Sequence, residues 1–113
     1  MQFTEEIIFQ LISFSGSARS YVFEALKNAK EGNYTKSEEN LAAAKKELLE
    51  AHKIQTNLIQ EEAAGNSMEV KLLMVHAQDH LMTSILAKDL IFQMVEMQRE
   101  INVLKEKLEE GAK

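Results

Sequence analysis

Hydrophobic residues recur at steps of three and four along most of the chain, which is the spacing of amphipathic helices and not of strands. The first such stripe comprises Phe3, Ile7, Leu11, Phe14, Ala18, Val22 and Ala25. The second comprises Leu41, Ala44, Leu48, Ala51 and Leu58. A third periodic segment runs from Met68 to about Glu110 without a helix breaker. The pattern therefore predicts three helices, the last of them clearly the longest.

Short polar and glycine-containing segments predict where these helices begin and end. Thr4, followed by two glutamates, favours the start of the first helix, and Gly32 suits the left-handed residue after its end. Residues 35–38 (TKSE) match a capping box and predict the start of the second helix, which should end near Ala64. The segment 65–67 (GNS) then precedes the third helix.

The third helix carries two apolar stripes on roughly opposite faces, so it should be buried on both sides. One stripe can close the core of its own bundle and comprises Met74, Leu81, Ile85 and Phe92. The other comprises Leu90, Met94, Met97, Ile101, Leu104 and Leu108. Its steps of four, three, four, three and four residues form a heptad seam. We therefore expect third helices from different copies of the chain to associate side by side.

Composition narrows the class of protein. The 113 residues suit one domain, spanning residues 1–113, and the absence of proline favours an all-α fold, a three-helix antiparallel bundle. A net charge of −5 argues against nucleic-acid binding. The lack of cysteine excludes disulfides and thiolate metal sites. Without a signal-peptide pattern or an apolar run of about 20 residues, we expect a cytoplasmic protein with no direct membrane insertion.

Two further polar residues call for an interpretation. Arg19 lies in a cluster of small residues around Gly16, which favours close helix packing and a groove floor beside the histidines. Arg19 could serve a partner or a phosphoryl group, but an ordinary solvated arginine is the expectation. His52 has no acidic residue three or four positions away, so we interpret it as structural or exposed.

The candidate site is the stretch that holds His76, Gln78, Asp79 and His80 on the third helix. Three readings compete for it. The residues could form a polar patch on a helical adaptor. His76 and His80, one turn apart, could share a metal ion, although two histidines and one carboxylate make a small ligand set. A neutral imidazole is also a good nucleophile near pH 7, so the site could be a histidine phosphocarrier.

Residues 75–83 (VHAQDHLMT), followed by AKDL at 87–90, resemble the signature of a known family. The similarity extends upstream to GSARS at 16–20, EAL at 24–26 and AHKIQT at 51–56. The family is the IIA component of the lactose/cellobiose branch of the bacterial phosphotransferase system. The similarity covers nearly the whole chain except about the last dozen residues, and the motif is closer to the cellobiose/chitobiose members than to the lactose members.

The resemblance implies a nine-helix homotrimer that acts as a phosphocarrier during uptake of a disaccharide of the cellobiose/chitobiose or lactose class. His76 would accept a phosphoryl group from phospho-HPr and pass it to a IIB protein. Asp79 matches an aspartate that meets its symmetry mates around a divalent cation, expected to be a structural Mg²⁺. Gln78 and His80 are expected to hold the phosphoryl group because they lie next to His76. The alternative is a non-catalytic helical adaptor with a structural metal site.

Overall fold

The computed structural model describes residues 2–66 and 68–112, with side chains from Glu5 onward, and contains three helices and no strand among these residues. Helix α1 spans Gln2–Lys30, α2 spans Tyr34–Ala63 and α3 spans Leu72–Ala112. The all-α fold and the number of helices are confirmed. None of the described helices is long and apolar enough to cross a membrane.

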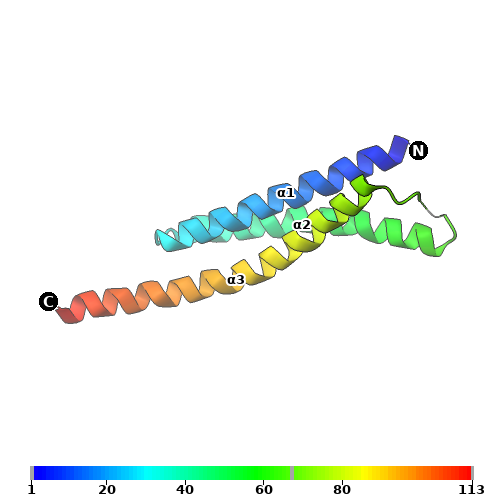
Figure 1. The fold of residues 1–113 in the computed structure, drawn as a ribbon. Coiled ribbons are helices and arrows are strands. Elements are labelled where there is room, and N and C mark those ends of the chain that lie inside the picture. The colour runs from blue at the N-terminus through cyan, green and yellow to red at the C-terminus, as the bar shows by residue number, and fades with distance from the viewer. Residues whose placement is uncertain (1, 67, 113) are drawn as a thin grey trace.

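The three helices form an elongated bundle in which α1 and α3 run in the same direction and α2 runs against them (Figure 1). Helix α1 packs against both other helices, whereas α2 and α3 touch each other at far fewer places. At 1.5 Å per residue the 41 residues of α3 extend about 62 Å. Its C-terminal part therefore projects beyond the turn that joins α1 to α2 (Figure 1).

All three helices contribute an inner face to the core. Leu11, Val22, Ala44, Ala51 and Leu81 are fully or almost fully buried. The inner stripe of α3 follows the prediction only in its first half. Beyond partly buried Ile85 the buried positions are Ile91 and Val95, and Phe92 is only partly buried. The predicted stripe from Met74 to Phe92 covers five turns at about 3.6 residues per turn, so it stays at one angle around α3. The buried positions Ala77, Ser84 and Ile91 instead recur every seven residues, a spacing that rotates gradually around a straight helix and moves burial away from Phe92.

Three predicted helix starts were wrong. Helix α1 begins at Gln2, so Thr4 lies inside it; the side chains of Phe3 and Thr4 lie outside the described ones. Helix α2 begins at Tyr34, and no side chain caps it. The expected capping box fails because Thr35 is already helical, whereas a capping residue must have a non-helical backbone.

The third start is four residues later than expected, because residues 68–71 are not helical and α3 begins at Leu72. Met68 packs against the core from this connecting segment, so its hydrophobic character reflects tertiary packing and not helix periodicity. The predicted role of Gly32 is confirmed: its φ is +79°, and the two N–H groups of Gly32 and Asn33 donate to the carbonyls of Ala29 and Asn28.

A group of hydrogen bonds fixes α3 where it leaves the bundle. The Asn102 amide donates to the Ala29 carbonyl at 2.9 Å and lies 2.8 Å from the Tyr34 hydroxyl. The Arg99 guanidinium lies over the Tyr34 ring, 4.4 Å from its centroid, and pairs with Glu38 at 3.2 Å. These contacts join α3 to the α1–α2 turn near Asn102, so the following residues of α3 extend past the bundle.

Candidate functional site

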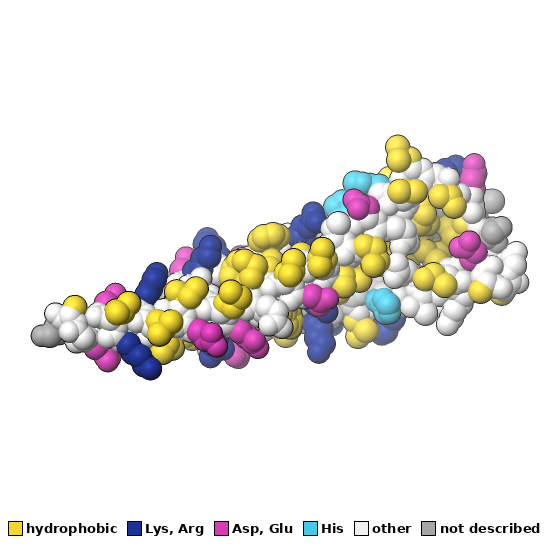
Figure 2. All heavy atoms as spheres, turned by 60° about the horizontal axis from the view of Figure 1, so that its bottom comes forward, with side chains coloured by type: hydrophobic (Ala, Val, Ile, Leu, Met, Phe, Trp, Pro, Cys, Tyr) yellow, Lys and Arg dark blue, Asp and Glu magenta, His cyan; other side chains and the backbone are white. Residues whose placement is uncertain are grey.

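The candidate site lies on the first three turns of α3, and its His76 and Asp79 lie outside the face that enters the core. Met74, Ala77, Leu81 and Ser84 form the buried face of this segment. His76 and Asp79 are exposed, and His80 is partly buried. The helical repeat produces this division, because residues three and four apart share a face. On the surface, histidine, acidic and basic side chains lie next to one another in one patch (Figure 2).

His76 and His80 are in direct contact, as their spacing of one turn predicts. Their ring centroids are 4.6 Å apart and the ring planes are perpendicular. The Nδ1 atom of His80 is buried without a hydrogen-bond partner among the described residues. The exposed His76 ring can therefore meet an incoming group, with His80 beside it as a nitrogen donor or acceptor.

Gln78 lies on a different side of the helix. Its amide oxygen accepts a hydrogen bond from the Gln55 amide of α2 at 2.7 Å, and its amide nitrogen lies 4.0 Å from the Met74 sulfur. Two residues along a helix are about 200° apart around its axis, so Gln78 points toward α2 while His76 points away. Within one chain, the structure does not bring Gln78 to His76.

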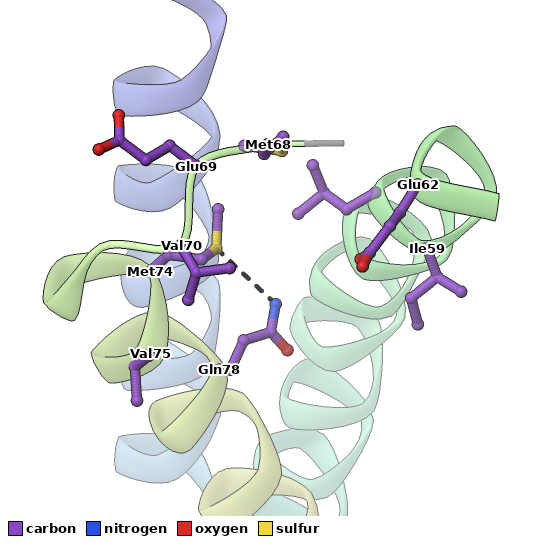
Figure 3. Close-up of a pocket in the computed structure, with 9 residues that line it drawn as sticks. Ile59, Glu62, Met68, Glu69, Val70, Met74, Val75 and Gln78 are labelled. Atoms are coloured by element: carbon purple, nitrogen blue, oxygen red, sulfur yellow. Dashed lines mark hydrogen bonds between the residues drawn. The ribbon is translucent and has the colours of Figure 1, made fainter. Parts of the chain in front are cut away.

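Gln78 also lines a pocket of about 310 Å³ between the end of α2 and the start of α3 (Figure 3). Hydrophobic side chains make up most of its wall. The lining residues are Leu58, Ile59, Glu62, Met68, Glu69, Val70, Met74, Val75 and Gln78. The pocket is thus an apolar neighbour of the histidine pair and contains neither histidine.

Arg19 is not the solvated arginine that the sequence suggested. It is partly buried, and its Nη2 donates a hydrogen bond to the Thr83 hydroxyl at 3.0 Å. The interpretation of Gly16 as a close-packing residue was also wrong, because a side chain built there would meet nothing within 4 Å. The small residues that do pack closely are Ser15 and Ala18, which are buried. His52 is exposed on α2, as expected.

The hypothesis of a metal site requires ligands from more than one chain. Among the described residues of one chain, no three histidine, aspartate or glutamate side chains converge as a metal site. Asp79 is exposed, and a carboxylate oxygen is a ligand that Mg²⁺ prefers. Asp79 therefore fits a divalent cation by its donor chemistry, provided that other copies supply further ligands.

Comparison with known proteins places this site in a family. The family model described as "PTS system, Lactose/Cellobiose specific IIA subunit" matches residues 6–99, which include all four site residues. The chain belongs to the lactose/cellobiose-specific IIA family. The expected family is thereby confirmed, and the last residues of α3 lie beyond the matched region.

Individual members of this IIA family are similar to this chain over most of their length. The N,N'-diacetylchitobiose-specific EIIA component of Escherichia coli K12 is 43% identical over 97 residues, which cover 86% of this chain and 84% of that protein. A cellobiose-specific enzyme IIA from Bacillus anthracis has a crystal structure with a TM-score of 0.88 and 43% identity, covering 91% of this chain and 94% of that one.

The chitobiose IIA protein of Escherichia coli was also solved together with a partner. In the solution structure of the IIA(chitobiose)–HPr complex of Escherichia coli, the matching chain is 42% identical, with a TM-score of 0.75. The match covers 87% of this chain and 95% of that one. The shared fold extends to a IIA protein that binds HPr.

Proposed function

We propose that this protein is a phosphocarrier of a sugar phosphotransferase system, and that all 113 residues form one IIA-type domain. It would accept a phosphoryl group from phospho-HPr on His76 and pass it to a IIB protein during disaccharide uptake. The observation that carries the proposal is His76 itself: an exposed imidazole, in contact with His80, inside the matched region of the IIA family. A relative in complex with HPr supports the choice of donor.

In this proposal the neutral imidazole of His76 attacks phosphorus, and the bond from phosphorus to the donor's leaving atom breaks as the new P–N bond forms. His80 is the side chain best placed to donate to a phosphoryl oxygen. Gln78 would hold the group only after it leaves Gln55, or from a neighbouring copy of the chain. The sugar is of the cellobiose/chitobiose or lactose class, and no residue of the site contacts it in this scheme.

We further propose that the working form is a homotrimer built along α3. The six residues of the predicted seam are all exposed, from 43% at Ile101 to 74% at Leu108. Figure 2 shows hydrophobic side chains recurring along the long arm of the molecule. An apolar row of this length is the kind of surface that a partner helix covers. Three Asp79 carboxylates would then meet and hold a structural divalent cation, expected to be Mg²⁺, whose charge offsets their repulsion.

The proposed function is tested by incubating the protein with phosphoenolpyruvate, enzyme I and HPr and measuring its intact mass. We expect the wild type and His52→Ala to gain one phosphoryl group and His76→Ala to gain none. His52 is a suitable control because it is an exposed histidine on another helix. Absence of labelling in a folded wild-type protein would instead favour the second candidate, a non-catalytic helical adaptor.

A further inference from the structure

Arg19 and Thr83 form a hydrogen bond that joins α1 to the candidate site. The Arg19 Nη2 donates to the Thr83 Oγ1 at 3.0 Å, although the two residues are 64 positions apart in sequence. Among the described residues, this is the single hydrogen bond between side chains of α1 and α3. A half-buried guanidinium in a defined contact is more ordered than an arginine in open solvent.

The Thr83 hydroxyl links Arg19 to the backbone of the site. It accepts from Arg19, so its own hydrogen is directed to the Asp79 carbonyl at 2.8 Å, with the His80 carbonyl at 3.3 Å. The guanidinium, the hydroxyl and the two carbonyls form one short chain of hydrogen bonds. A positive charge on α1 is therefore connected to the turn of α3 that carries Asp79 and His80.

The positive charge of Arg19 forms no ion pair among the described residues. The other arginine of the chain, Arg99, pairs with Glu38 at 3.2 Å. The surface one turn earlier on α1 is open at Gly16. The side of α1 next to Arg19 therefore carries a charge without an ion pair among the described residues and has room for a further group at Gly16.

A phosphoryl group on His76 would add close to two negative charges beside Asp79, which is already negative. From this geometry we infer that Arg19 is a positioning residue for the phosphorylated state. It acts through Thr83, holds the Asp79–His80 turn against α1, and supplies the positive potential that favours phospho-His76. The inference rests on the proposed function and adds a specific residue to it.

The test measures the equilibrium of phosphoryl transfer between HPr and this protein, because a residue that only stabilises the fold would not shift that equilibrium. Arg19→Met should lower the equilibrium ratio of phosphorylated to free protein about tenfold. Arg19→Lys, which keeps the charge, should restore the ratio to within about threefold. Arg99→Met is the matched control, because it removes the same charge at the far end of the bundle and should leave the ratio unchanged.

Thr83→Val tests whether Arg19 acts through the hydroxyl. If it does, Thr83→Val reproduces the loss, and the Arg19→Met/Thr83→Val double variant is no worse than either single variant. Circular dichroism checks that each variant is folded. If Arg19→Met does not fold, the comparison of Arg19→Lys and Thr83→Val with the wild type replaces it. If the wild type is labelled but Arg19→Met leaves the ratio unchanged, the inference is wrong and the proposed function stands. The same holds if Arg99→Met lowers the ratio as much as Arg19→Met does. An unlabelled wild type overturns the proposed function.

Discussion

The imidazole rings of His76 and His80 meet edge to face, with their centroids 4.6 Å apart. The two histidines are not equivalent, because His76 is exposed and His80 is partly buried with its Nδ1 unpaired among the described residues. An attacking nucleophile must be accessible, whereas a residue that holds the phosphoryl group needs only to lie beside it. The difference in exposure therefore favours the proposed roles, with His76 as the nucleophile and His80 beside the phosphoryl group.

His80→Ala should remain able to accept a phosphoryl group but should do so roughly tenfold to a hundredfold more slowly, since one donor to the transferred group is lost. Rapid-quench measurement of transfer from phospho-HPr gives this rate, and His52→Ala serves as the control with an unchanged rate. If His80→Ala abolishes labelling and His76→Ala retains it, the two roles are reversed.

The seam on α3 should govern assembly. Light scattering of the wild type should give about three times the chain mass of 12.8 kDa. Leu90→Glu should reduce this to the monomer mass, because a charge buried between helices is not solvated. Leu49→Glu on α2 is the matched control, with 52% exposure against 55% at Leu90, and should leave the mass unchanged. A wild-type monomer at micromolar concentration would contradict the proposed trimer.

Replacing Asp79 should change the response of the melting temperature to metal without abolishing phosphoryl transfer. If three Asp79 carboxylates meet around a cation, a chelator leaves like charges close together and lowers the melting temperature, and added Mg²⁺ restores it. Asp79→Leu removes both the repulsion and the ligand, so its melting temperature should not respond to a chelator. It should still be phosphorylated by phospho-HPr. Loss of transfer in a folded Asp79→Leu trimer would show that the metal or the carboxylate takes part in the reaction.

Replacing two buried serines by alanine should affect stability differently. Ser37 donates to the Ala25 carbonyl at 2.7 Å, whereas the hydroxyl of Ser15 has no partner among the described residues, and both side chains are almost fully buried. Ser37→Ala should lower the free energy of unfolding by about 1 kcal/mol. Ser15→Ala should leave it unchanged or raise it by up to about 1 kcal/mol, because it removes an unsatisfied polar group. Urea denaturation of the two variants in parallel measures the difference.

The sequence by itself determined the three helices, the family and the contact between the two histidines of the candidate site. Helical periodicity identifies Leu11, Val22 and Leu81 as core residues because the spacing of buried positions follows directly from 3.6 residues per turn. The same repeat places His76 and His80 in contact, since residues four apart are neighbours on one helix. These features depend on one helix at a time, so they can be read along the chain.

Only the tertiary structure decided which residues of different helices contact one another. Arg19 has the sequence context of a solvated arginine, and its bond to Thr83 arises from the packing of α1 against α3. Gln78 is adjacent to His76 in sequence but bonds to Gln55 of α2, which directs it away from the histidines. Met68 packs against the core from a non-helical segment, so its hydrophobicity misled the prediction of where α3 begins. Such contacts join residues far apart in the chain, and no local pattern encodes the distance between them.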